Sequence, residues 1–382
     1  MVHTDQSDSE QIKTTHIGSL PRPADLLDLL AKRQSGEEID EDLWDSTVRD
    51  ATYEVVQEQA EAGIDIINNG EQPRVSFNWY LENRLAGIEG EREAQMWADL
   101  AEYPEYAEES FDTDVIDLTT QPAVVDEIKY TGYNAANEEI NVFHDELDAI
   151  DADFDDTFIT AASPGVIAAT HENEVYDTEE DYLFALADAM QEEYELVAET
   201  GATLQIDSPD VLATYHRNYA DYDVDEFIEA SVRPRIEAIN HALKNIPSDQ
   251  VRIHTCWGSY EGPHHLDISL EEVLPELYEA DVSALSVEQA NPRHQHEYRA
   301  FAEQSPPDDW TLIPGVVDVK TNVIDHPEKV ADRIERAADA LGDPTRIIAA
   351  PDCGFGTQAG LGMVHSEIVW AKLDALNQGA EI

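Results

Sequence analysis

The sequence predicts a (β/α)₈ barrel, and two observations carry this prediction. Eight short apolar or β-rich runs recur along the 382 residues, and most of them are separated by stretches with apolar residues at three- and four-residue spacing. Strands that alternate with helices in this way form a parallel sheet. Eight such strands, with the helices outside, favour one closed (β/α)₈ (TIM) barrel that takes up residues 1–382 as a single domain.

The predicted elements are spread along the whole chain. The strands are Lys13 to Leu20, Ile64 to Asn69, Thr157 to Ala162, Thr203 to Asp207, Val251 to Thr255, Val282 to Val287, Thr311 to Val317 and Arg346 to Ala350. Helical spacing covers Leu43 to Ala62, Glu179 to Thr200, Val224 to Lys244, Leu270 to Ala280, Arg293 to Glu303, His326 to Leu341 and Ser366 to Asn377. Asp223 and Ser269 precede two of these helices, as residues that cap helix N-termini do.

One acidic, tyrosine-rich segment, residues 95–156, breaks this rhythm. It has no clear helical period, so we expect an insertion between the second and third barrel strands. Gln121 to Tyr133 and Glu139 to Phe143 are predicted to form a small hairpin within it. The insertion would either cover the mouth of the barrel or extend into solvent.

The composition is strongly acidic, with a net charge of -61 from 83 acidic and 22 basic residues. Such an excess usually indicates disorder, but the 42% of hydrophobic residues and their regular runs predict a folded chain. We interpret the charge as a solvated surface adapted to high salt, where counterions screen the repulsion. A nucleic-acid backbone is excluded as a natural partner of such a surface.

The sequence gives no sign of secretion or of a membrane span. The first ten residues lack the basic and apolar regions of a signal peptide, and no apolar stretch approaches the length of a spanning helix. Two cysteines in a chain of this length do not make a disulfide framework. We therefore expect a cytoplasmic protein with reduced thiols.

Both cysteines follow predicted strands directly. Cys256 stands just after the fifth strand, which also contains His254, and Cys353 comes just after the eighth. Thiolate and imidazole groups are ligands that Zn²⁺ prefers, and the carboxyl ends of barrel strands meet at one mouth. Glu288, which follows the sixth strand, could be a fourth ligand. A lone cysteine is more often a small buried residue, so this predicted zinc site, which would activate a thiol, depends on the joint pattern.

Polar groups follow most of the other strands as well. They are Gly18 and Ser19 after the first, Gly70 and Glu71 after the second, Asp207 at the end of the fourth, Asp318 and Lys320 after the seventh, and Asp352 after the eighth. Each also has a plain structural interpretation, such as a turn for Ser19 or an ion pair for Lys320. The pairs His264–His265 and His294–His296 are weaker metal candidates, because they lie in loops or at helix starts.

With these motifs in place, the chain resembles the cobalamin-independent methionine synthase family, particularly its single-barrel core members. The resemblance is collinear from about residue 11 to residue 360. It is carried by five segments, Thr14 to Arg22, Asn69 to Glu71, Gln205 to Asp207, Ile253 to Cys256 and Pro351 to Gly354.

The resemblance implies an enzyme that transfers a methyl group to the zinc-bound thiolate of homocysteine to form methionine. The implied zinc ligands are His254, Cys256, Glu288 and Cys353. The segment Ile17, Gly18 and Ser19 would hold the amino-acid substrate, and Glu71 and Asp207 would bind its amino group. Asp207 and Lys320 are the residues to which we assign catalytic roles.

The chain departs from the long, two-barrel members of the family in two ways. Lys320 stands where those enzymes carry a histidine thought to donate a proton, and the N-terminal barrel that helps to bind folate is missing. Lys320 would supply the proton if burial lowers its pKa. The methyl donor stays open between methyltetrahydrofolate and a methylcorrinoid protein.

Three other functions remain open at this point. An alkyltransferase acting on another thiol, such as the epoxyalkane:coenzyme M transferases, is the first, although a sulfonate calls for cationic partners and Glu71 and Asp207 are acidic. A catalytically silent barrel that stores zinc is the second. The third is a decarboxylase related to the porphyrin-processing barrels, which lack this set of metal ligands.

Overall fold

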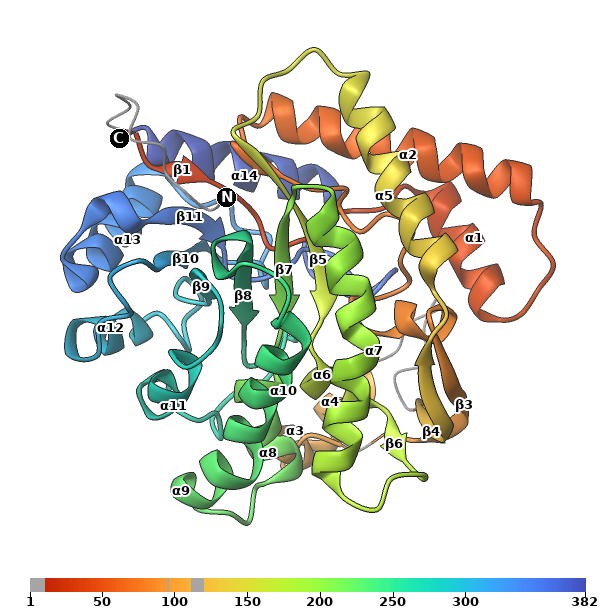
Figure 1. The fold of residues 1–382 in the computed structure, drawn as a ribbon. Helices are drawn as coiled ribbons and strands as arrows, with labels where there is room; N and C mark the ends of the chain where they lie inside the picture. The colour runs from red at the N-terminus through yellow and green to blue at the C-terminus, as the bar shows by residue number, and fades with distance from the viewer. Residues whose placement is uncertain (1–10, 95, 111–119) are drawn as a thin grey trace.

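Eight parallel strands form the centre of the computed structural model, which describes residues 11–94, 96–110 and 120–382 (Figure 1). Their order around the sheet is β1-β11-β10-β9-β8-β7-β5-β2. A parallel bridge between Thr15 and Ile66 joins the two edges. The predicted (β/α)₈ barrel is therefore confirmed. The N-terminal residues 1–10, in which the sequence shows no signal peptide, lie outside the described residues.

All eight predicted strands occur in the barrel. Their bounds are β1 (Lys13–Thr14), β2 (Ile66–Ile67), β5 (Asp156–Ala162), β7 (Thr203–Asp207), β8 (Val251–Thr255), β9 (Ala284–Val287), β10 (Thr311–Val317) and β11 (Ile348–Pro351). The first two are shorter than predicted, because only two residues of each make regular ladder hydrogen bonds. In Figure 1 the arrows of β5 and β8 point toward the end of the molecule that carries α3, α8 and β6.

The outer helices agree with the predicted helical stretches in most cases. They are α2 (Glu41–Glu61), α7 (Glu179–Glu199), α9 (Val224–Phe227), α10 (Arg233–Leu243), α11 (Leu270–Leu277), α12 (Ala300–Glu303), α13 (Pro327–Leu341) and α14 (Ser366–Ala380). A π-helical turn at Ile228–Val232 joins α9 to α10 just ahead of Pro234, which has no N–H to donate. The additional helices are α1 (Ala24–Gln34), α5 (Tyr133–Asp148), α6 (Pro164–Thr170) and α8 (Asp210–Asn218).

The predicted helix Arg293 to Glu303 is wrong over its first part. Regular helical structure begins only with a 3₁₀ turn at Glu297–Arg299. Upstream of it, the side-chain oxygen of Asn291 accepts hydrogen bonds from the backbone N–H groups of Arg293 and His294. This turn directs His294 inward instead of starting a helix.

The predicted hairpin in the acidic segment is also wrong. β4 (Thr120–Tyr130) pairs with β3 (Leu85–Glu93), which lies upstream of the predicted insertion, and β6 (Glu172–Asn173) joins them after the third barrel strand. Glu139 to Phe143 lie inside α5, which packs against α2 and α7 as a barrel helix. Its buried residues, Ala136, Glu139, Ile140, Val142 and Phe143, do include helical spacing, but a charged residue among them concealed the pattern.

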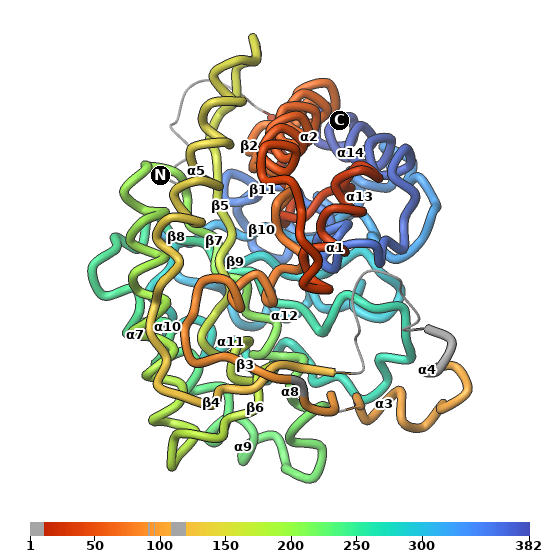
Figure 2. Tube along the Cα trace, turned by 90° about the vertical axis from the view of Figure 1, so that its right-hand side faces the viewer, coloured from red at the N-terminus to blue at the C-terminus, as the bar shows by residue number. Residues whose placement is uncertain are grey.

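Part of the inserted segment covers the mouth of the barrel. Trp97 and the short helix α3 (Ala98–Ala101), followed by α4 (Pro104–Ser110), pack against the loop that follows β8. The fully buried carboxylate of Asp99 accepts hydrogen bonds from the Tyr260 hydroxyl (2.5 Å) and from the His264 backbone N–H (3.0 Å). Figure 2 shows β3, β4, β6 and α3 together at one end of the barrel.

The barrel interior contains a buried cation, the guanidinium group of Arg252. Ile17, Phe158, Ile313 and other apolar side chains fill the interior, and the guanidinium of Arg252 lies 3.7 Å from the centre of the Phe158 ring. Arg252 donates to the side chain of Gln205 (2.8 Å), and Gln205 in turn donates to Asp207 (2.7 Å) and to the backbone oxygen of Ile17 (2.5 Å). This buried chain of hydrogen bonds thus fixes two of the predicted substrate-binding residues, Ile17 and Asp207, from the barrel interior.

Candidate active site

Three of the four predicted metal ligands meet at the mouth of the barrel. His254 lies in β8, Cys256 follows β8 and Cys353 follows β11, and their ligand atoms all lie within 4.8 Å of one another. The Nε2 atom of His254 is 3.7 Å from the sulfur of Cys353. All three side chains are buried. Two thiols and an imidazole converging at this spacing are a donor set that fits Zn²⁺.

The electrostatics of the two thiols favour a thiolate in this cluster. A hydrogen bond from Cys256, together with His254, lowers the pKa of Cys353 well below its usual value, although burial opposes the shift. Metal ions bind the deprotonated form of cysteine. Cys353 is therefore the thiol that favours the thiolate form, while the hydrogen bond with Cys353 and burial raise the pKa of Cys256.

Glu288 lies beside this cluster but is not one of the three converging ligands. It follows β9 and is fully buried, and one of its oxygens, Oε2, is 3.1 Å from His294 Nδ1 and 3.5 Å from Lys320 Nζ. Burial raises its pKa, but these two neighbours outweigh that effect and lower it to about 2. Glu288 is therefore ionised and close to the other ligands.

Asp352 has a structural role at this mouth. Its carboxylate accepts hydrogen bonds from the backbone N–H groups of Gln289, Ala290 and Asn291 at 2.8–2.9 Å, and from the Asn291 side chain. Burial and the nearby charge of Glu288 raise its pKa to about 6. Asp352 ties the loop of one ligand, Glu288, to the loop of another, Cys353.

A second group of predicted residues lies across the mouth from Glu288. One oxygen of Glu71 accepts a hydrogen bond from Thr160 (2.8 Å), and the other oxygen is buried with no hydrogen-bond partner among the described residues. Burial raises the pKa of Glu71, although Arg74 and Arg22 oppose the shift. A buried carboxylate oxygen without a donor fits an incoming ammonium group.

Asp207 lies between this group and the metal ligands. Burial raises its pKa to about 7, and the charges of Glu71 and Cys353 also raise it, while His254 opposes the shift. The two carboxylates of Glu71 and Asp207 are thus held where both cannot easily be charged unless a cation binds.

Gly18 and Ser19 complete this part of the mouth. Gly18 has a φ of 141°, and a Cβ atom there would lie 2.6 Å from Oε1 of Glu71, so the position admits no side chain. The Ser19 hydroxyl accepts a hydrogen bond from the N–H of Gly356 (3.3 Å), and its carbonyl accepts one from Phe355 (2.9 Å). Ile17, Gly18 and Ser19 are thereby fixed between Glu71 and the loop that carries Cys353.

The pKa of Lys320 is not lowered, although a lowered pKa was the condition under which Lys320 would supply the proton. Burial does act in that direction, but Glu288, Asp352 and the two thiols outweigh it and raise the pKa above the ordinary 10.5. The Lys320 ammonium lies 3.5 Å from Oε2 of Glu288 and 3.5 Å from Nε2 of His264. Lys320 is therefore a stable cation at the mouth.

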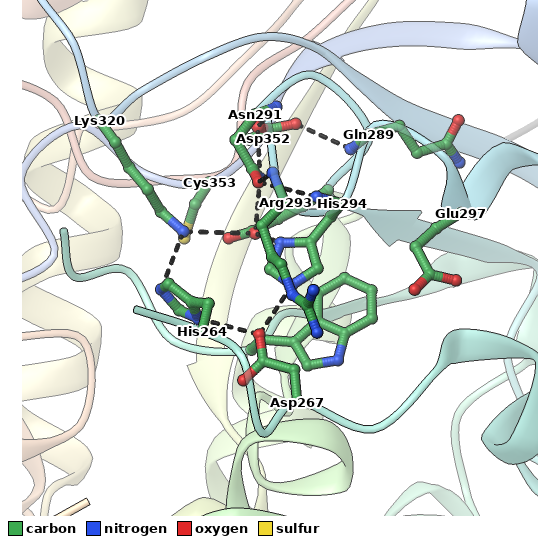
Figure 3. A network of polar contacts seen from close by, with 12 residues as sticks. His264, Asp267, Gln289, Asn291, Arg293, His294, Glu297, Lys320, Asp352 and Cys353 are labelled. Atoms are coloured by element: carbon green, nitrogen blue, oxygen red, sulfur yellow. Dashed lines mark hydrogen bonds and ion pairs between the residues drawn. The ribbon is translucent and has the colours of Figure 1, made fainter. Parts of the chain in front are cut away.

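Two of the weaker metal candidates, His264 and His294, come together with Asp267, which had no sequence signal of its own. His264, Asp267 and His294 form a buried hydrogen-bonded group, in which Oδ2 of Asp267 lies 2.9 Å from His264 and 2.8 Å from His294 (Figure 3). The three also meet the spacing of a metal site. We interpret them as a hydrogen-bonded network, because one carboxylate oxygen already pairs with both imidazoles. The pairing of His264 and His294 across a loop is not visible from their separation in the sequence.

The Glu71 loop is held by a buried ion network that the sequence did not reveal. Glu139 of α5 pairs with Arg74 and Arg84, and it accepts a hydrogen bond from Asn69 (3.0 Å). Arg74 also donates to the hydroxyl and the carbonyl oxygen of Thr160 at 3.0 Å. This network connects α5 to the partner of the Glu71 carboxylate.

Replacing Glu139 by glutamine is expected to lower the free energy of unfolding by about 3–5 kcal/mol, because the buried Arg74 loses its paired carboxylate and Arg84 is left with Glu193. Chemical unfolding in high salt measures this loss. The exposed Glu138 gives the matched control, E138Q, which should stay within about 0.5 kcal/mol of the parent. An E139Q protein as stable as E138Q would contradict the importance of the network.

Comparison with known proteins decides the family. The family model described as the catalytic domain of cobalamin-independent synthases matches residues 12–104 and 165–367. The chain belongs to this family. The unmatched residues between the two matched parts include β4 and α5, where the inserted segment lies.

Curated relatives match over nearly the full length. A methionine synthase of Thermococcus kodakarensis is 28% identical over 97% of this chain and 93% of its own, and one of Saccharolobus solfataricus is 26% identical over 97% and 94%. The structure of a B12-independent methionine synthase from Shewanella sp. W3-18-1 has a TM-score of 0.70 at 19% identity, covering 97% of both chains. That likeness shows the shared fold.

None of the described helices is long and apolar enough to cross a membrane.

Proposed function

We propose that this family member methylates the thiol of homocysteine to form methionine, with Zn²⁺ as its metal. The observation that carries the proposal is the pairing of two features at one mouth. A cluster of His254, Cys256 and Cys353 suited to zinc lies next to Glu71 and Asp207, which are suited to an amino group. Methionine synthase relatives that match over most of this chain support the same reaction. We place the enzyme in the cytoplasm, where its thiols stay reduced.

His254, Cys256 and Cys353 would hold the zinc ion, with Glu288 as the fourth ligand. When bound, zinc would lower the pKa of the substrate thiol and keep its sulfur as a nucleophilic thiolate. Two thiolates and a carboxylate supply three negative charges against the two positive charges of zinc. This excess keeps the sulfur electron-rich.

The residues on the other side of the mouth orient the substrate. Glu71 and Asp207 would pair with the homocysteine ammonium group, which would satisfy the orphaned oxygen of Glu71 and relieve the repulsion between the two carboxylates. Gly18 and Ser19 leave backbone and hydroxyl groups to hold the carboxylate end. Fixing the amino acid at this end places its sulfur at the metal ligands.

Lys320 would donate a proton to the departing methyl carrier. The carbon–sulfur bond forms as the bond between the methyl group and its carrier breaks, and a nitrogen carrier such as methyltetrahydrofolate then needs a proton. The Lys320 ammonium lies 3.5 Å from Oε2 of Glu288 and its raised pKa keeps the proton on it, so we assign it this donation. A methylcorrinoid carrier would leave without a proton and would need only the in-line approach.

The first test is the zinc content of the purified protein together with homocysteine-dependent methyl transfer in high KCl. Methylcobalamin and methyltetrahydrofolate are offered separately. We expect about one zinc ion per chain and methionine from at least one donor, which would also identify the donor. Zinc without methionine, but with alkylation of coenzyme M, would contradict the proposed substrate and favour the other thiol alkyltransferases. The acidic pair Glu71 and Asp207 disfavours that outcome.

A further inference from the structure

The two oxygens of the Glu288 carboxylate have different surroundings. Oε2 is contacted by Asn291 Nδ2 (3.0 Å), His294 Nδ1 (3.1 Å) and Lys320 Nζ (3.5 Å). Oε1 is buried and has no hydrogen-bond partner within the part of the chain that the structure describes. One oxygen therefore accepts a hydrogen bond from Asn291 and lies against two further nitrogen atoms, and the other has no hydrogen-bond partner among the described residues.

His294, one of the three neighbours of Oε2, is held firmly in place. Its ring is stacked on Trp257, with centroids 4.0 Å apart and planes inclined by 5°. Its other nitrogen, Nε2, lies 2.8 Å from Oδ2 of Asp267, and its backbone N–H donates to Asn291. The side chain is 2% exposed, so it cannot turn away from Glu288 without breaking the stack and the contact with Asp267.

The loop around this imidazole is itself held in place. Asp267 contacts His264 with the same oxygen that contacts His294, and His264 touches the ammonium of Lys320 (Figure 3). The indole N–H of Trp257, the stacking partner, donates to the backbone oxygen of Ile268 (2.7 Å). The neighbours of Oε2 thus belong to one connected group, which adjoins the metal ligands through Trp257, next to Cys256, and through Asp352, next to Cys353.

We propose that His294 is a positioning residue that holds Oε2 of Glu288, so that Oε1 alone is offered to the metal and can be exchanged for the substrate thiolate. This inference rests on the proposed zinc site. Donors on Oε2 draw negative charge from the carboxylate, which weakens Oε1 as a ligand. They also keep the buried carboxylate paired after it leaves the metal, so that the exchange does not create an isolated buried charge.

The test compares H294F, H294Q and the control H296F, whose parent residue is more than half exposed. Phenylalanine keeps an aromatic ring against Trp257 but removes both nitrogens, whereas glutamine gives up the ring and keeps a donor. Each protein is loaded with Zn²⁺ and its zinc content is measured. X-ray absorption then follows the replacement of an oxygen neighbour of zinc by sulfur as homocysteine is added.

For H294F we expect normal zinc content and a half-saturating homocysteine concentration raised about 10-fold or more. H294Q should fall between H294F and the parent, and H296F should match the parent. Equal titrations for H294F and the parent would overturn the role of His294, as would an H294Q protein that is impaired as strongly as H294F. A parent protein that holds zinc but never exchanges oxygen for sulfur would instead overturn the proposed metal site.

Discussion

Replacing Lys320 by methionine is expected to lower turnover about 10²-fold or more while the zinc content stays unchanged. Methionine keeps the length of the apolar stem and removes only the charge. Lys320 is not one of the metal ligands, but its ammonium lies at 3.5 Å from both Glu288 and His264. Methyl transfer from whichever donor supports turnover in the first test, measured under single-turnover conditions, isolates the chemical step.

The pH dependence gives this prediction a second readout. Glu288, Asp352 and the thiols raise the pKa of Lys320 above 10.5 against the effect of burial. A raised pKa keeps the ammonium charged below that value, so Lys320 should cause no loss of turnover between about pH 7 and pH 9. The exposed Lys329 supplies the control K329M. Near-normal turnover in K320M would rule out the assigned role, and a falling rate above pH 7 that K320M abolishes would contradict the raised pKa.

The barrel could be predicted because its strands are short, apolar and regularly spaced. Parallel strands buried on both faces are continuous apolar runs, and Val251–Thr255 and Thr311–Val317 are buried at every position. The inserted segment did not follow this rule. β4 finds its partner β3 across residues 94–119, and α5 places the charged Glu139 on its buried face because two arginines from elsewhere in the chain meet it there.

The candidate site could be predicted only where a strand end carries the residue. His254, Cys256 and Cys353 were found because two strands that are far apart in the sequence aim their ends at the same mouth. His264, Asp267 and His294 lie on loops, and their contacts depend on loop conformations such as the left-handed φ of 50° at His264. Asp352 also lies at a strand end, but its carboxylate accepts hydrogen bonds from the backbone N–H groups of Gln289 and Ala290. A polar residue at a strand end can therefore have a structural role.

Asp207 offers a different kind of prediction, in which a substitution stabilises the protein and removes its function. Burial raises the pKa of Asp207 from 3.8 to about 7. A raised pKa means that the contribution of Asp207 to stability is fully present below pH 3.8 and is lost as the pH rises through 7. This shift corresponds to about 4 kcal/mol between the two protonation states.

D207N, which is neutral at every pH, is therefore expected to unfold with a higher free energy than the parent above pH 7, by up to about 4 kcal/mol. The advantage should shrink toward pH 5. Chemical unfolding of the metal-free, substrate-free proteins at several pH values in the same salt measures both effects. Homocysteine affinity should fall about 10²-fold or more, because the ammonium group loses a buried carboxylate partner.

The exposed Asp221 provides the matched control, D221N, which should change neither the stability nor the affinity. A D207N protein that is no more stable than D221N at pH 8 would contradict the electrostatic cost of Asp207. Unchanged homocysteine binding would contradict its place at the amino group. The two measurements are independent of each other. The stability of D207N reports the unfavourable energy of a charged Asp207 in the empty site, whereas the homocysteine affinity reports the favourable interaction of the ammonium group with Glu71 and Asp207.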